Sequence, residues 1–253
     1  MNSNVLGIIP ARYESTRFPG KPLALIHGKS MIRHVYERAK ECSSLSRVIV
    51  ATDDQRIFDH VSAFGGEVRM TSREHRSGTE RIGEVMKLIQ DEEPGSAIEL
   101  VVNIQGDEPL LNPIQIAEVL DCFRDSAVHI GTLKKIIVDK AELFNPNVVK
   151  LVTDKQGRAI YFSRSPIPFL RGIPEHQWIE KNAHFKHVGI YAYRIAVLRK
   201  LVSLSPSPLE IAESLEQLRW LEYGYHIQVE RTETESVAVD TPEDLLKFTN
   251  NIA

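Results

Sequence analysis

The sequence predicts an α/β protein built on a doubly wound, mostly parallel sheet, with a smaller mixed or antiparallel subdomain. Through the N-terminal half, short apolar runs rich in β-branched residues alternate with amphipathic segments, a pattern typical of parallel strands joined by helices. After Asn145-Pro146-Asn147 the pattern changes, and strand-like segments follow one another with loops between the first two. We therefore expect a single domain over residues 1–253, in which about 130–195 form an inserted subdomain that covers the sheet edge as a lid.

The expected elements of the N-terminal half begin with a strand over residues 5–9, which Pro10 ends. After it, helices are expected at 30–40, 53–64, 79–90 and 113–124, and strands at 47–52, 67–70, 100–105 and 129–138. Ser30 is expected to cap the first of these helices. Right-handed crossovers between parallel strands place the loops that follow them along one edge of the sheet, where open α/β sheets bind their ligands.

The C-terminal half adds strand-like segments at 148–152, 159–162 and 187–193. An apolar stripe then predicts one helix over about 209–223, with the stripe in the core or at an interface. The stripe consists of Leu209, Ala212, Leu215, Leu218 and Leu221. The residues off the stripe, which are Glu216, Gln217 and Arg219, are expected on a solvated face.

A capped helix is expected near the C-terminus. Thr241 is the expected N-cap, Pro242 the first helical residue, and Asp244 reaches back to the cap. Asp240 is then not needed as the cap. A carboxylate left free at a strand-to-helix junction suits a metal site, and a structural role is an equal alternative.

The composition excludes several classes of protein. A net charge of -3, with basic residues spread along the chain, gives no nucleic-acid or membrane signal. No apolar run approaches ~18 residues, and the N-terminus lacks a basic segment followed by an apolar one, so we expect no export. Cys42 and Cys122 are expected in helices of a reduced, cytosolic protein. Neither zinc-ligand spacing nor a nucleophile motif occurs in the sequence.

The loop after the first strand has the residues that a polyphosphate needs. Arg12, Arg17 and Lys21 lie within ten residues of one another, separated by Ser15, Thr16 and Gly20. Cations, hydroxyls and glycine beyond a strand indicate a triphosphate site, and a solvated basic loop is the alternative. No G-x-G-x-x-G occurs near the loop, and Gly28-Lys29-Ser30 is interpreted as a turn and helix start rather than a Walker motif.

Two further loops are expected at the same edge. Gly106 lets the chain bend after its strand, so that Asp107 faces the basic loop and could bind Mg²⁺ together with Asp240. A salt bridge between Asp107 and a loop cation is the alternative, and the sequence does not separate the two. The segment Ser77-Gly78-Thr79 is either a second ligand loop near a base or ribose, or a capped helix start.

Motifs in order from about residue 5 to 246 resemble those of the 3-deoxy-D-manno-octulosonate (KDO) cytidylyltransferases, or CMP-KDO synthetases. They are IIPARYESTRFPGKPL, EHRSGTER, NIQGDEPL, FNPNVVKLV, YFSRSPIPF, KHVGIYAYR, PSPLE with LEQLRWLEYG, and VDTPEDL. The resemblance implies a nucleotide-diphospho-sugar transferase-like fold. It also implies a cytoplasmic homodimer that uses CTP, KDO and Mg²⁺ to make CMP-KDO and pyrophosphate for the lipopolysaccharide inner core.

The resemblance also implies a role for each site residue. Arg12, Arg17 and Lys21 would hold the triphosphate, Ser77, Gly78 and Thr79 would lie near the cytidine, and Asp107 and Asp240 would bind Mg²⁺. The implied KDO pocket consists of Gln105, Arg164, His187, Tyr191, Glu216 and Gln217. The sequence departs from the usual motifs at Phe18, Ala192 and Ala238, and the last lies close to Asp240.

Two other functions remain open at this point. One is a synthetase for CMP-sialic acid or another sugar nucleotide, against which the YFSR and LEQLR segments argue. The other is a catalytically silent nucleotide-binding protein on the same fold, which would not need all three loop cations and both aspartates.

Overall fold

The computed structural model describes residues 4–14 and 17–250, so that Ser15 and Thr16 of the basic loop lie outside the described residues. The chain divides into two compact units. The first comprises residues 1–117, 193–202 and 236–253, and the second comprises residues 118–192 and 203–235.

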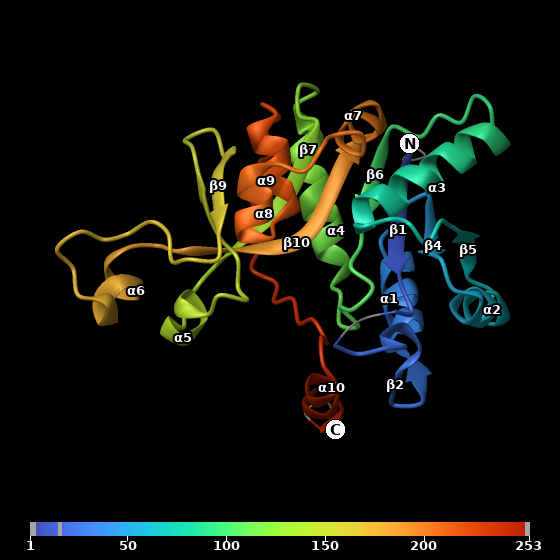
Figure 1. Cartoon of the computed structure of the whole chain (residues 1–253), viewed down its shortest axis with the longest axis horizontal. Coiled ribbons are helices and arrows are strands. Elements are labelled where there is room, and N and C mark those ends of the chain that lie inside the picture. Colours follow the sequence, from blue (N-terminus) through green and yellow to red (C-terminus); the bar gives the residue numbers. More distant parts are fainter. Residues whose placement is uncertain (1–3, 15–16, 251–253) are drawn as a thin grey trace. The chain divides into compact units, whose positions relative to one another are not determined.

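The first unit contains the predicted parallel sheet (Figure 1). Its first strand, β1 (Val5–Ala11), lies between β4 (Arg47–Thr52) and β6 (Leu100–Asn103), and β5 (Glu67–Met70) pairs with β4. All three pairings are parallel. The helices between these strands are α1 (Met31–Lys40), α2 (Gln55–Ala63) and α3 (Gly78–Glu92). The predicted α/β alternation is therefore confirmed.

Strand β1 runs past the expected stop at Pro10 and ends at Ala11. The carbonyl of Ile8 accepts a hydrogen bond from the amide of Ile104, so the backbone N and C=O of Ile8 point towards β6. The backbone N and C=O of Pro10, two residues later, point to the same side. Pairing with β6 has already ended at Ile8 and Asn103. Proline is tolerated because its missing N–H would have had no partner strand on that side.

The Gly28-Lys29-Ser30 segment is a turn, as expected. It belongs to a hairpin of β2 (Leu25–Ile26) and β3 (Lys29–Ser30), with His27 and Gly28 at φ 48° and 79°. A short 3₁₀ turn, Lys21–Leu23, precedes the hairpin. Ser30 stands at the N-cap position of α1 but does not cap it, because its hydroxyl pairs with His60 at 2.7 Å.

The first unit also contains α7 (Ile195–Leu201), which the sequence did not predict, and α10 (Pro242–Asn250). Thr241 caps α10 by accepting from the amide of Asp244 at 3.2 Å, and the Asp244 carboxylate accepts from the amides of Asp240 and Thr241. The expected cap is confirmed. The expected strand before it is wrong, because residues 232–240 form neither strand nor helix.

The second unit is mixed. Strand β7 (Ile130–Ile136) pairs in parallel with β11 (Gln228–Arg231), which the sequence did not predict. The long β10 (Phe185–Arg194) runs antiparallel to β8 (Lys150–Thr153), which in turn runs antiparallel to β9 (Ala159–Ser163). The short helices are α5 (Lys140–Phe144) and α6 (Trp178–Lys181), with 3₁₀ turns at Cys122–Arg124 and Glu175–Gln177. Helix α4 (Pro113–Asp121) begins in the first unit and ends in the second.

The single helix expected over 209–223 is wrong. Ser214 adopts a left-handed conformation with φ 52°, which separates α8 (Pro208–Glu213) from α9 (Glu216–Glu222). The interruption changes which side chains face inward, so Gln217 and Arg219 are 6% and 5% exposed instead of solvated. Arg219 donates there to Glu216 and to the carbonyl of Leu204, and its guanidinium lies 3.2 Å from the carboxylate of Glu210.

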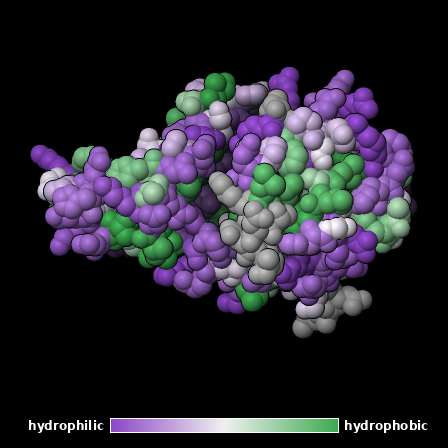
Figure 2. Space-filling view, turned by 90° about the horizontal axis from the view of Figure 1, so that it is seen from below, coloured by the Kyte–Doolittle hydropathy of each residue, from purple (hydrophilic) through white to green (hydrophobic). Residues whose placement is uncertain are grey.

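Both cysteines are buried and unpaired. Cys122 lies in a 3₁₀ turn, whereas Cys42 lies just beyond the end of α1, so its expected place in a helix is wrong. Of the helices in the described ranges, none is long and apolar enough to cross a membrane. One face of the molecule is largely hydrophilic, with apolar side chains gathered in separate patches (Figure 2).

Candidate active site

Two aspartates of the first unit share the ammonium group of Lys21. Lys21 Nζ donates to Asp107 Oδ2 at 2.7 Å and to Asp240 Oδ1 at 3.2 Å. Arg17 reaches the same Asp240 oxygen at 3.1 Å. The Lys21 side chain is only 14% exposed, so water screens the Asp107 pair less than a surface pair. The structure thus unites two loop cations with both predicted metal ligands.

Main-chain contacts bring the two aspartates together. Asp107 follows β6, and its carbonyl accepts from the amide of Val239 at 2.9 Å, immediately before Asp240. Gly106 packs against the end of β1, where a Cβ would lie 2.8 Å from the carbonyl oxygen of Pro10. The sequence therefore needs glycine at this position, because any larger residue would push the Asp107 loop away from β1.

The donor set at this position fits a divalent cation with oxygen ligands. Asp107 and Asp240 each place a carboxylate oxygen within hydrogen-bond distance of one positive group, so both can reach a single cation. Mg²⁺ is commonly held by one or two carboxylates, and substrate oxygens and water complete its coordination. Within the part of the chain that the structure describes, three or more His, Cys, Asp or Glu side chains are nowhere grouped to hold a metal.

A third carboxyl group lies beside the aspartates. Burial raises the pKa of Glu108 to about 7, a hydrogen bond from the Ser236 hydroxyl opposes the shift, and the charge of Asp107 adds to it. Like Val239, Ser236 belongs to the segment before α10, so Glu108 gives that segment a second attachment to the loop after β6.

The second predicted loop begins α3. Ser77 is the N-cap and accepts from the amide of Glu80 at 3.2 Å, and the Glu80 carboxylate accepts from the amide of Arg76 at 2.7 Å. The capped helix start is thus present, and it is compatible with a nucleotide contact. A Cβ on Gly78 would lie 3.3 Å from Pro10, so this loop lies against the end of β1, as the cationic loop does.

Sequence reasoning missed two buried polar residues near these loops. Asn103 ends β6, is 6% exposed, and its Oδ1 accepts no hydrogen bond from the described residues. Arg81 in α3 is fully buried and pairs with Asp53 at 2.7 Å. Burial lowers the pKa of Arg81, and the nearby charge of Arg12 lowers it further. A polar residue closing the apolar run LVVN was the available signal for Asn103.

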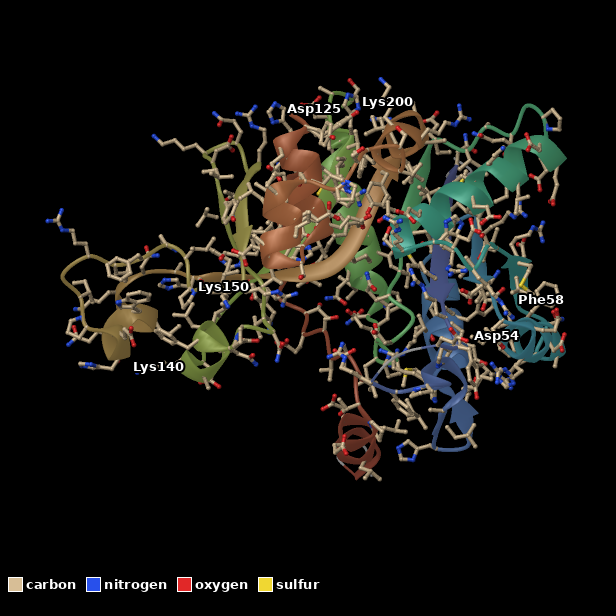
Figure 3. The ribbon with its side chains drawn as sticks, in the orientation of Figure 1. Asp54, Phe58, Asp125, Lys140, Lys150 and Lys200 are labelled. Atoms are coloured by element: carbon tan, nitrogen blue, oxygen red, sulfur yellow. The ribbon has the colours of Figure 1, made fainter. Side chains whose placement is uncertain are left out.

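Asp54 connects α2 to the first loop through Arg56. The Asp54 carboxylate caps α2 and accepts from Arg56 at 2.6 Å (Figure 3). The guanidinium carbon of Arg56 lies 3.2 Å from the ring centroid of Tyr13. Hydrogen bonds from Arg56 lower the pKa of Asp54, so the carboxylate stays ionised and the contact to the loop is kept.

Two of the residues implied for KDO, His187 and Tyr191, are neighbours on β10. Their ring centroids are 5.1 Å apart, and Tyr191 packs edge-on against Trp220 of α9 at 5.2 Å. The His187 ring also meets Phe162 of β9 edge-on at 5.2 Å. Burial lowers the pKa of His187 to about 3, so the imidazole is neutral at pH 7.

Arg164 is held mainly by main-chain carbonyls. Its guanidinium donates to the carbonyls of Glu213, Pro146 and Ser214 at 2.7, 3.0 and 3.4 Å. The carbonyl of Arg164 accepts from Lys150, whose fully buried ammonium lies inside the second unit (Figure 3). This arrangement fixes the β9 end to the turn between α8 and α9.

The remaining implied residues are Glu216 and Gln217 of α9 and Gln105 of the first unit. Glu216 accepts from Arg219 at 2.9 Å, and Gln217 is buried. Gln105 is partly exposed and belongs to the first unit, two residues before Asp107.

Comparisons with known proteins agree on one family. The model of the cytidylyltransferase family matches residues 6–232. The 3-deoxy-manno-octulosonate cytidylyltransferase of Parabacteroides distasonis is 51% identical over 246 residues, which is 96% of this chain and 95% of the relative. The enzyme of the same name from Porphyromonas gingivalis is 49% identical over 250 residues, covering 98% and 96%.

Solved structures give the same result. The structure of a CMP:2-keto-3-deoxy-manno-octonic acid synthetase complexed with CTP is 43% identical, covers 98% of both chains and superposes with a TM-score of 0.88. A 4-diphosphocytidyl-2C-methyl-D-erythritol synthase shares only 11% identity over 98% of both chains, with a TM-score of 0.64, which shows a common fold and nothing more.

Proposed function

This chain belongs to the 3-deoxy-manno-octulosonate cytidylyltransferase family, and we propose on that premise that it transfers CMP from CTP to the anomeric hydroxyl of KDO. The products are CMP-KDO, for the lipopolysaccharide inner core, and pyrophosphate. One observation carries the proposal: Lys21 and Arg17 meet Asp107 and Asp240 beyond the carboxyl ends of β1 and β6.

The cationic loop is the proposed triphosphate site. Arg12, Arg17 and Lys21 bind phosphate oxygens, and the segment Ser77–Thr79 contacts the cytidine. In the structure Lys21 neutralises two carboxylates, so on nucleotide binding its ammonium exchanges a carboxylate for a phosphate oxygen. Such an exchange keeps the lysine paired throughout and avoids leaving a partly buried charge alone.

The reaction itself depends on position and charge. The anomeric hydroxyl attacks the α-phosphorus in line with the departing pyrophosphate, and the negative charge that develops on the phosphoryl oxygens meets Lys21 and the arginines. Asp107 and Asp240 would hold Mg²⁺, which supplies further positive charge to those oxygens when bound. A dedicated general base is not part of this proposal.

The proposed KDO contacts in the second unit are Arg164, His187, Tyr191, Glu216 and Gln217. The adjacency of His187 and Tyr191, together with the packing of α9 on Tyr191 through Trp220, supports a shared surface. A contact from Gln105 and the lid role of residues 130–195 stay predictions.

We also propose a homodimer in the cytoplasm. Exposed apolar side chains on α8 support self-association, because Ile211 and Leu209 are 69% and 38% exposed. Light scattering after size exclusion tests this: the wild type is expected to elute as a dimer and Ile211→Glu as a monomer. The buried, unpaired cysteines are compatible with a reducing compartment.

The function is tested by pyrophosphate release from purified protein with Mg²⁺. CTP, ATP, GTP and UTP are each offered with KDO, sialic acid or no sugar. Release that requires both CTP and KDO is expected. Release with sialic acid instead would refute the acceptor, and no release from folded protein that still binds CTP would indicate a silent nucleotide-binding protein.

A further inference from the structure

A buried threonine lies against the imidazole of His187. Thr132, in the middle of β7, is completely buried, and its Oγ1 lies 2.9 Å from His187 Nε2. The same oxygen lies 2.8 Å from the carbonyl oxygen of Ile190 and 3.3 Å from that of Val188. Three polar atoms of β10 therefore surround one hydroxyl group.

The number of protons decides how these atoms are bonded. A hydroxyl has one proton to donate and two lone pairs that accept, whereas a carbonyl oxygen only accepts. If Thr132 donated to His187, its oxygen would face the Ile190 carbonyl oxygen at 2.8 Å with no proton between them. Thr132 therefore donates to Ile190, and the short contact to Nε2 is satisfied only when His187 carries its proton there and donates it.

A neutral imidazole with its proton on Nε2 presents Nδ1 as an acceptor. Burial keeps the ring neutral at pH 7, because it lowers the pKa of His187 to about 3. Nδ1 of His187 has no hydrogen-bond partner among the described residues. It also does not belong to the side-chain nitrogen and oxygen atoms of these residues that are both buried and without a hydrogen bond. The ring contacts with Phe162 and Tyr191 hold it in place.

We propose that Thr132 is a positioning residue, which holds His187 in the Nε2–H form and so makes Nδ1 the acceptor for a hydroxyl group of the sugar substrate. The proposal rests on the proposed function, in which His187 contacts KDO. It excludes the reverse role, in which this nitrogen donates to the KDO carboxylate. A sugar that lacks the matching hydroxyl would leave Nδ1 unpaired. Thr132 and His187 together therefore select for a sugar substrate that carries this hydroxyl group.

The tautomer is tested directly by nitrogen-15 NMR of full-length protein at pH 7, with the His187 ring signals assigned by their loss in His187→Gln. Wild type and Thr132→Ser, which keeps the hydroxyl, are expected to show Nε2 protonated and Nδ1 bare. Thr132→Val, which keeps the shape, is expected to show a mixture of tautomers. Protonation of Nδ1 in the wild type, or an unchanged tautomer in Thr132→Val, overturns the proposal.

Kinetics separate this role from a structural one. Thr132→Val is expected to raise KM for KDO about tenfold, the worth of one hydrogen bond, with KM for CTP unchanged. Thr132→Ser is expected to restore the wild-type KM. Thr232→Val, the same change at a fully buried threonine of the same unit that bonds the amide of Thr234, is the matched control and is expected to leave both constants unchanged.

Two results distinguish this proposal from the proposed function. Equal rises of both KM values in Thr132→Val and Thr232→Val would show a general loss of packing and overturn the positioning role. Absence of any KDO-dependent turnover in the wild type would refute the proposed function, while the NMR result would still decide the tautomer.

Discussion

The neutral histidine makes stability depend on pH in a way that can be measured. His187 has a pKa of about 3 in the folded chain, against 6.5 for the unperturbed side chain, because burial penalises its charged form. Below pH 6.5 the unfolded chain therefore binds a proton that the folded chain does not. Stability contributed by this residue is fully present above pH 6.5 and is lost as the pH falls towards 3.

The size of the effect follows from the pKa difference. Well inside that window each pH unit lowers the free energy of unfolding by about 1.4 kcal/mol, so between pH 7 and 5 the wild type is expected to lose about 2 kcal/mol through His187 alone. His187→Gln removes the titrating group. It also loses ring contacts with Phe162 and Tyr191, which lowers stability equally at every pH.

The assay is urea denaturation of both proteins at pH 7, 6 and 5, with the difference in unfolding free energy plotted against pH. Titration of other groups cancels in this difference. His176→Gln, which removes an exposed histidine, is the control and is expected to leave the pH dependence unchanged. Parallel curves for wild type and His187→Gln would refute the assignment of a neutral imidazole with a lowered pKa.

Three other substitutions have expected outcomes in the first unit. Lys21→Gln is expected to lower kcat/KM at least about 10²-fold, while the circular dichroism spectrum and the melting midpoint change little. Normal turnover would show that Lys21 does not take part in the reaction. Gly106→Ala places a Cβ about 2.8 Å from the Pro10 carbonyl and is expected to destabilise by about 1–3 kcal/mol in urea denaturation, so an unchanged midpoint would contradict the close packing. Arg81→Met leaves the partner carboxylate of Asp53 without its buried cation and is expected to cost about 3 kcal/mol, and full stability would show that water satisfies Asp53.

Local patterns were sufficient for much of the fold. Alternating apolar runs and amphipathic segments predicted β1, β4, β5 and β6 and the helices between them. In each element the buried apolar residues form a run or recur at the spacing of a helix, and both patterns can be seen in the sequence. Thr241 and Asp244 predicted the start of α10 through a cap whose atoms all lie within a few residues. These features depend on short stretches of chain.

Features that depend on distant parts of the chain were not visible. Pro10 stays in β1 because β6 ends earlier, and no local pattern marks Ser214 as the left-handed residue that separates α8 from α9. That turn buries Gln217 and Arg219, which a continuous helix would have exposed. Thr132 carries no sequence signal, since its role arises only from the partner strand β10.

The candidate site shows the same division. The cations and aspartates were identified as residue types placed after strands. Their pairing, with Lys21 between Asp107 and Asp240, required the contact of Val239 with Asp107 across more than a hundred residues. The sequence left a metal and a salt bridge as alternatives for Asp107. The structure has the salt bridge, formed by groups that also suit a metal.

CMP transfer to KDO is tested most simply by phosphorus NMR of the reaction mixture with CTP, KDO and Mg²⁺. We expect CMP-KDO, seen as a new phosphodiester signal, and pyrophosphate to appear in equal amounts, and Lys21→Gln to form neither at a comparable rate. Pyrophosphate accompanied by free CMP, with no sugar phosphodiester while the products are followed from the first minutes, would show that the protein hydrolyses CTP and does not transfer CMP to KDO.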